Sequence, residues 1–154
     1  MGVSGAGKST IGNLVAQELS LPFFDGDDFH SPENIVKMKN ETPLTDEDRK
    51  VWLSSLNQLA QKELENKGCV IACSALKEDY RTILTIGIEN SCRWIFLKGS
   101  FDQISKRLHK RQNHFMSPRL LKSQFDILEE PKRALSVDID LDPNEIVKIV
   151  KDKC

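Results

Sequence analysis

Gly2-Val3-Ser4-Gly5-Ala6-Gly7-Lys8-Ser9 is the stretch that decides the fold, because it fits the pattern G-x-x-x-x-G-K-S/T at every fixed position. The glycines let successive backbone N–H groups turn inward around a polyphosphate. Lys8 brings a positive charge to the β- and γ-phosphates, and the Ser9 hydroxyl is a ligand for Mg²⁺. A flexible Gly- and Ser-rich turn is the alternative, but the helical pattern directly behind the stretch argues against it. The sequence predicts a phosphate-binding loop.

The residues of this loop form the expected nucleotide site, together with the start of the helix that follows. The N-terminus of that helix adds unpaired amides and the positive end of its dipole to the same anion site. The residues expected to contact nucleotide phosphates are Gly2, Val3, Ser4, Gly5, Ala6, Gly7, Lys8, Ser9 and Thr10.

Only Met1 precedes the loop, although a buried strand normally leads into this motif. That strand is usually central in the sheet. We therefore expect the first strand to be truncated in the chain as given. Two explanations stay open: the chain is a shortened version of a longer product, or it is a form that folds poorly and is weakly active.

The composition is that of an ordinary soluble globular protein, with 154 residues, 39% hydrophobic and 29% charged. We expect a single domain over residues 1–154. The net charge of −1 gives no general surface for nucleic acid or an anionic membrane. No apolar run approaches the ~20 residues that span a bilayer, and no signal-peptide pattern is present. The four cysteines form no C-x-x-C pair, which favours reduced thiols in a cytoplasmic protein.

Strand and helix patterns alternate along the chain, which predicts an α/β fold with a parallel sheet and right-handed crossovers. Apolar residues at helical spacing predict a first helix over about 9–20 and a long helix that ends near Gly68. Runs without polar residues at 69–73 and 94–97 are typical of strands buried on both faces. Two further strands are expected at 21–24 and 135–139, and further helices near Pro32, Glu78, Ser100, Pro118 and Pro143.

An acidic turn, Asp25-Gly26-Asp27-Asp28-Phe29-His30, follows the first apolar run. We expect these acids at the carboxyl edge of the sheet, beside the phosphate loop. Asp27 is the candidate that accepts or aligns the proton of an acceptor hydroxyl, and Asp25 is the candidate for the outer shell of Mg²⁺. A solvated turn is the alternative, because Asp and Gly are ordinary turn formers. The roles of Asp28 and His30 stay open, and an exposed His30 beside the Ser31 cap fits equally well.

Three classes of protein with this loop can be compared. A GTPase would carry N-K-x-D, but the one Asn-Lys pair, 66–67, is followed by Gly68 and Cys69. A motor or transporter ATPase would have a long apolar strand that ends in an acid, and the buried strands here run into Ser and Lys. A small-molecule kinase needs an acid near the loop and cations around the transferred phosphoryl group, and this chain has both. The sequence favours a kinase.

The sequence resembles the gluconokinase family along nearly its whole length. The most specific parts are Cys73-Ser74-Ala75-Leu76-Lys77 with Tyr80-Arg81, and His114-Phe115-Met116. This resemblance implies a three-layer P-loop kinase fold, like that of nucleoside monophosphate kinases, and phosphorylation of the 6-hydroxyl of D-gluconate with Mg·ATP. The blocks that carry the match are 1–10, 24–30, 43–49, 73–81, 97–101, 111–116 and 124–131.

The resemblance and the chemistry together suggest a role for each candidate. Lys8 and Asp27 are the expected catalytic residues, and Ser9 with Asp25 the expected Mg²⁺ residues. A guanidinium fork matches a carboxylate, so cations are expected at the substrate's acid end, although each taken singly could be an exposed surface charge. The expected substrate residues are Asp27, Arg49, Lys77, Arg81 and His114; a lid at about 107–120 is expected to bring Arg107 and Arg111 to ATP.

Besides the missing first strand, one departure and two alternatives accompany the resemblance. The family usually has Gly before His-Phe in the lid, where this chain has Asn113, so the lid geometry is less secure. Family members are often dimers, which allows a homodimer here. The alternatives are a kinase of another small hydroxy acid or polyol, such as shikimate, and an ATP-binding protein with little turnover.

Overall fold

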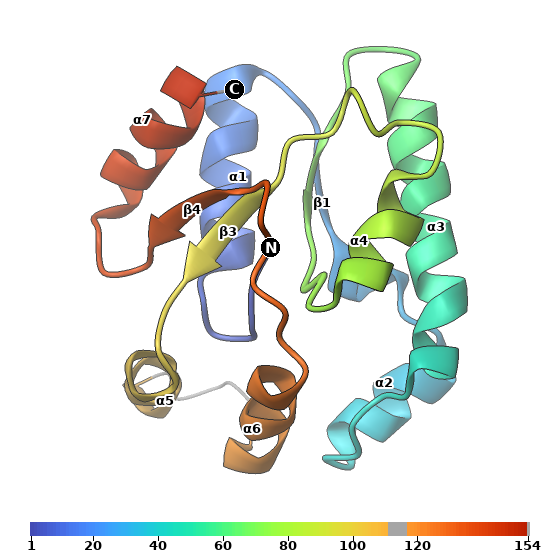
Figure 1. Ribbon diagram of the computed structural model, residues 1–154, viewed down its shortest axis with the longest axis vertical. Helices are drawn as coiled ribbons and strands as arrows, with labels where there is room; N and C mark the ends of the chain where they lie inside the picture. The colour runs from blue at the N-terminus through green and yellow to red at the C-terminus, as the bar shows by residue number, and fades with distance from the viewer. Residues whose placement is uncertain (111–116, 154) are drawn as a thin grey trace.

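The computed structural model describes residues 1–110 and 117–153. Arg111, Asn113 and His114 therefore lie outside the described residues. Helices and strands alternate as expected (Figure 1). The elements are α1 Lys8–Leu19, β1 Phe23–Asp25, the 3₁₀ turn η1 Gly26–Phe29, α2 Pro32–Lys39, α3 Asp46–Leu64, β2 Val70–Ala72, α4 Glu78–Thr85, β3 Ile95–Lys98, α5 Phe101–Lys110, α6 Pro118–Asp126, β4 Leu135–Asp138 and α7 Pro143–Lys153.

The described strands form two parallel pairs. β1 pairs with β2, and β3 pairs with β4. The predicted α/β class and the parallel direction are confirmed. The expectation of one sheet is wrong in detail, because the structure describes no ladder between β2 and β3. An apolar cavity of about 530 Å³ lies between these two strands, with Ile71 and Ile95 among its lining residues.

Met1 and Gly2 lie between the two strand pairs (Figure 1). The Met1 amine donates to the Ile95 carbonyl at 2.5 Å, and the Met1 carbonyl accepts from the Leu97 N–H at 3.0 Å. On the other side, the Gly2 N–H donates to the Ser74 carbonyl at 3.2 Å. The entry to the phosphate loop is therefore anchored to β3 on one side and to the segment that follows β2 on the other.

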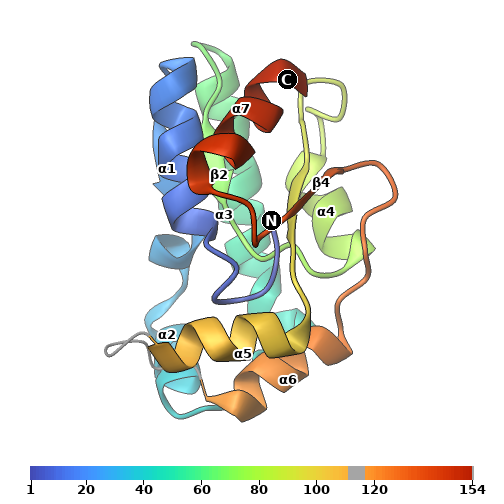
Figure 2. The ribbon, with the colours of Figure 1, turned by 90° about the vertical axis from the view of Figure 1, so that its left-hand side faces the viewer.

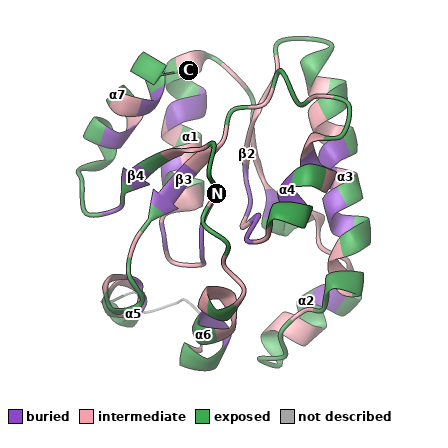
Figure 3. Cartoon of the chain, in the orientation of Figure 1, coloured by how far each residue is buried: buried purple, intermediate pink, exposed green. Residues whose placement is uncertain are grey.

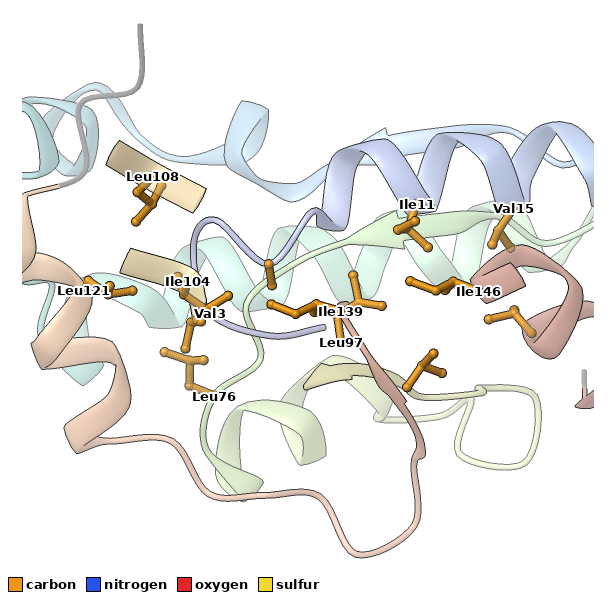
Figure 4. Close-up of a cluster of buried hydrophobic side chains, with 13 residues drawn as sticks. Val3, Ile11, Val15, Leu76, Leu97, Ile104, Leu108, Leu121, Ile139 and Ile146 are labelled. Atoms are coloured by element: carbon orange, nitrogen blue, oxygen red, sulfur yellow. The ribbon is translucent and has the colours of Figure 1, made fainter. Parts of the chain in front are cut away.

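Helices cover the strands on two sides, with α1 and α7 on one side and α3 and α4 on the other (Figure 1). Buried positions follow the strands and the helix sides that face them (Figure 3). One core cluster joins the phosphate loop to α1, α5, α6 and α7 through Val3, Ile11, Ile104, Leu121 and Ile146 (Figure 4). Full burial of such a side chain stabilises a fold by about 1.5–3 kcal/mol. Packing therefore fixes the loop from its apolar side.

A second core cluster holds α3 and α4 together, with Trp52, Leu53, Leu56 and Tyr80 among its members. α5 and α6 lie side by side at the end of the molecule nearest the phosphate loop (Figure 2). The two clusters leave the carboxyl ends of β1 and β2 facing the same region as the loop. This region contains the candidate site.

Helix caps form where the sequence places Ser, Thr or Asp. The Thr45 hydroxyl accepts from the Asp48 N–H at 3.2 Å, and the Asp48 carboxylate accepts from the Thr45 N–H at 2.9 Å, so the two residues form a capping box at the start of α3. α3 ends at Leu64, earlier than predicted, because a turn closes it and the Gly68 N–H bonds back to the Glu63 carbonyl at 2.8 Å.

The prediction that the strand at 69–73 is buried on both faces needs correction. Val70 and Ile71 of β2 are half-buried, not fully buried, since both line the cavity beside β3. Within the described ranges, none of the helices combines the length and apolar character needed to cross a bilayer. Cys69, Cys73 and Cys92 are free thiols, and burial raises the pKa of the Cys73 thiol to about 11.

Candidate active site

The phosphate loop presents its backbone to open space at Gly7. This residue is the N-cap of α1 and has a φ of 93°, in the region that favours glycine. A Cβ built at Gly7 meets nothing within 4 Å, so the residue requires glycine for its conformation and not for lack of room. No acidic residue lies in the first turn of α1, and no side chain caps it. The first amides of α1 are left for an anion.

The Lys8 side chain folds back over the same loop. Its Nζ donates to the Val3 carbonyl at 3.1 Å. Burial lowers the pKa of Lys8, and the negative charge of Asp27 opposes that shift. Lys8 therefore lies within electrostatic reach of the acidic turn.

Asp25 joins the loop to the acidic turn. Its Oδ2 accepts a hydrogen bond of 2.5 Å from the Ser9 hydroxyl, and its Oδ1 accepts one of 3.1 Å from the Asp27 N–H. Asp25 thus caps η1 while it touches the helix that follows the phosphate loop. Asp27 itself is exposed at the start of η1 and free to meet a ligand. The structure brings Ser9, Asp25 and Asp27 together, as the sequence predicted.

Local packing explains why the turn lies there. A Cβ on Gly26 would come within 2.8 Å of the Ala72 carbonyl, so only glycine lets the turn approach the end of β2. The buried Trp52 indole donates to the Gly26 carbonyl at 2.6 Å. Tertiary contacts from β2 and α3 therefore hold the backbone that carries Asp27.

Cations on the far side of the turn gather around Tyr80. The Lys77 Nζ lies 5.4 Å and the Arg49 Cζ 5.5 Å from the centre of its ring. Lys77 also donates to both Asp46 oxygens at 2.9 and 2.8 Å, and the Tyr80 hydroxyl donates to the same carboxylate. These bonds lower the pKa of Asp46 and raise the pKa of Lys77. Lys77 is therefore cationic and held in place by Asp46.

Arg81 is placed differently from the other expected substrate residues. Its side chain is only 4% exposed. The Nη1 donates to the Ala75 and Leu76 carbonyls at 2.9 and 3.2 Å, and the Nη2 donates to Glu78 at 2.6 Å. These bonds hold the loop that leads into Lys77. Arg81 thus holds the loop before Lys77 from its buried side.

Arg107 lies on α5, which packs against the phosphate loop near Gly5. Its guanidinium donates to the Ile139 carbonyl and lies 3.4 Å from Asp140. Arg107 therefore faces the segment that follows β4. Thr10 is exposed in the first turn of α1.

Two residues that sequence reasoning assigned no role also reach the site. The Gln124 Oε1 of α6 accepts from the Ser4 N–H at 2.7 Å, across 120 positions of sequence. Asp46 appeared only inside the 43–49 block of the resemblance, with no role. A search for Asp near the Lys77 loop would not have found it, because the two residues lie 31 positions apart. Gln124 likewise appeared only inside a block of the resemblance, 124–131.

A loop built for phosphates, an acidic turn beside it and cations beyond the turn define a P-loop kinase of small molecules. The family model described as "Shikimate kinase" matches residues 4–146. This agrees with the fold class predicted from the sequence.

Named relatives narrow the class. A "Probable gluconokinase" from Dictyostelium discoideum is 46% identical over 161 residues, which cover 96% of this chain and 80% of that protein. The "Thermoresistant gluconokinase" of Escherichia coli (strain K12) is 46% identical over 145 residues, 91% of this chain and 82% of that protein. The crystal structure of a gluconokinase from Sinorhizobium meliloti 1021 has a TM-score of 0.87 and 40% identity, over 96% of this chain and 85% of that one. The chain belongs to the gluconokinase family.

Proposed function

We propose that this chain transfers the γ-phosphoryl group of ATP to the 6-hydroxyl of D-gluconate. The observation that carries the proposal is the contact between Ser9 and Asp25, which joins a phosphate-binding loop to an acidic turn. Membership of the gluconokinase family supplies the acceptor. The acceptor hydroxyl has to lie where Asp27 and the γ-phosphate meet.

The phosphate end of the site would use the loop and its lysine. Residues 2–10 would surround the phosphates through backbone amides, and Lys8 would exchange its bond to the Val3 carbonyl for phosphate oxygens. Ser9 and Asp25 offer hydroxyl and carboxylate oxygens, the ligands Mg²⁺ prefers. In the described ranges no group of three or more His, Cys, Asp or Glu gathers, which suits an ion held largely by phosphates and water. When bound, Mg²⁺ neutralises charge on the transferred group.

The acceptor end would use the acidic turn and the cations around Tyr80. Asp27 would take the proton of the 6-hydroxyl while the oxygen of that hydroxyl bonds to the γ-phosphorus. The bond between the γ-phosphorus and the β,γ-bridging oxygen breaks at the same step, and ADP leaves. Arg49 and Lys77 would bind the carboxylate of gluconate. Arg81 would act indirectly, by holding the Lys77 loop. Several roles stay predictions: Arg107 and Arg111 at ATP, and His114 at the substrate. The homodimer and the cytoplasmic location also stay predictions.

An ADP-release assay tests the proposal. D-gluconate, shikimate and a set of nucleoside monophosphates are each supplied with Mg·ATP, and the product is identified by ³¹P NMR. We expect release with gluconate alone, formation of 6-phosphogluconate, and loss of most turnover in Lys8→Ala. Release with shikimate but not gluconate contradicts the proposal. Thermal stabilisation by ATP with no acceptor-dependent release indicates a nucleotide-binding protein instead.

A further inference from the structure

His30 lies beside the acidic turn of the proposed acceptor site. It directly follows η1, three residues after Asp27. Asp27 and Arg49 are the charged groups that act electrostatically on its ring, and the proposed function assigns them to the phosphoryl end and the carboxylate end of the acceptor respectively. His30 is therefore near both groups that the proposed acceptor would reach.

Packing holds the His30 ring in one plane. The ring stacks on Trp52 with the centroids 4.4 Å apart and the planes 15° from parallel. Trp52 is itself buried and bonded to the Gly26 carbonyl. The imidazole is thus fixed by the same contacts that hold the acidic turn, which is the condition for a group that selects a ligand.

The two nitrogens of His30 differ. Nδ1 is buried and has no hydrogen-bond partner among the described residues. A buried N–H without an acceptor is costly, so the neutral ring carries its proton on Nε2. Burial also lowers the pKa of His30, which keeps the ring neutral near pH 7. The ring therefore offers an N–H donor on the nitrogen that is not buried.

We infer that His30 is a specificity-determining residue whose Nε2–H binds a hydroxyl in the middle of the acceptor chain. The inference rests on the proposed function and deepens it. The acceptor class is an open-chain polyhydroxy acid, with its terminal hydroxyl at Asp27, its carboxylate at Arg49 and an intermediate hydroxyl at His30. A neutral donor suits a hydroxyl oxygen, which needs no countercharge.

The test uses D-gluconate and its 2-, 3-, 4- and 5-deoxy analogues in the same assay. His30→Phe keeps an aromatic ring for Trp52 and removes the donor. We expect the wild type to turn over one analogue roughly 10–100-fold less efficiently than gluconate, as kcat/KM. In His30→Phe, kcat/KM for gluconate should fall to the level of that analogue, while the analogue itself changes little.

A matched pair of variants tests which of the two nitrogens of His30 binds the hydroxyl. The amide nitrogen of Gln reaches the position of Nε2, and that of Asn the position of Nδ1, while both lose the stack on Trp52. We expect His30→Gln to retain more of the discrimination than His30→Asn. His109→Phe, on the exposed face of α5, serves as the histidine control and should change no ratio.

Two results overturn the inference. One is an equal fall in kcat/KM for gluconate and all four analogues in His30→Phe, which a purely structural role produces. The other is discrimination by His30→Asn equal to or above that of His30→Gln. Failure of the proposed function is distinct from both, because the wild type would then release no ADP with gluconate.

Discussion

The Ser9 hydroxyl and the Asp25 carboxylate share a hydrogen bond of 2.5 Å, which links the first turn of α1 to the end of β1. One residue comes from the phosphate loop and the other from the acidic turn 16 positions later. In a kinase of this class, a cation between phosphates and protein needs oxygen ligands at such a junction. The pair is therefore the natural place to test Mg²⁺.

Asp25→Asn should weaken the use of Mg²⁺ more than the use of ATP. An amide offers one uncharged oxygen in place of a carboxylate, and loss of such a partner typically costs 10–100-fold in metal affinity. We expect the Mg²⁺ concentration for half-maximal rate to rise by about that factor at saturating ATP and gluconate. Initial rates over a MgCl₂ series provide the measurement. Asp28→Asn, on the exposed neighbour in η1, is the control, and identical Mg²⁺ curves for both variants contradict the assignment.

Asp27→Asn should lower the turnover number kcat. The amide keeps the size of the side chain and cannot accept the hydroxyl proton, and general-base catalysis contributes typically 10²–10⁴-fold. We expect kcat to fall within that range while KM for ATP stays close to the wild-type value. Steady-state ADP release measures both constants, with Asp28→Asn again as the control. A near-normal kcat in Asp27→Asn removes Asp27 from its role.

Variants of Arg81 and Lys77 should distinguish a residue that holds the loop in place from one that contacts the substrate. Arg81→Met leaves the buried Ala75 and Leu76 carbonyls without their partner, which costs about 1–3 kcal/mol of unfolding free energy. Lys77→Met removes a partly exposed ion pair to Asp46, which contributes little to stability. We expect both variants to raise KM for gluconate, and only Arg81→Met to lower the midpoint of urea unfolding.

The outcome for this pair has a simple reading. Unchanged stability in Arg81→Met would show that the buried guanidinium is not needed to hold the loop. A normal KM for gluconate in Lys77→Met would remove Lys77 from the acceptor site.

The lowered pKa of Asp48 should make the stability of the fold depend on pH in the acid range. The hydrogen bond from Lys37 and those from Thr45 lower the pKa of Asp48 from 3.8 to about 2. A carboxylate with a lowered folded-state pKa stabilises the fold above its unfolded pKa, and this contribution is lost as the pH falls through the folded value. We expect the Tm difference between wild type and Asp48→Asn to be constant above pH 5 and to shrink between about pH 4 and pH 2.

Scanning calorimetry over a pH series measures this difference. Glu47→Gln, at the exposed neighbouring position of α3, is the control. A Tm difference that stays the same down to pH 2 would show that the bonds of Asp48 do not depend on its charge.

The sequence by itself determined the features that arise from short stretches of backbone. The phosphate loop depends on the spacing of Gly7, Lys8 and Ser9, and its helix begins where that spacing demands. The capping box of Thr45 and Asp48 lies within a single helical turn. Parallel pairing followed from the alternation of strands and helices. The loop and the capping box depend on local conformation, and the parallel pairing depends on the order of strands and helices along the chain, so all three could be predicted without the fold.

Only the tertiary structure decided which polar side chains face the site. Lys77 and Arg81 have the same charge and lie four residues apart, yet packing leaves Lys77 beside Asp46 and buries Arg81 behind its loop. Gln124 meets Ser4, and His30 stacks on Trp52, through contacts between elements far apart in the chain. No local pattern encodes such contacts, because they depend on how separate helices share one core.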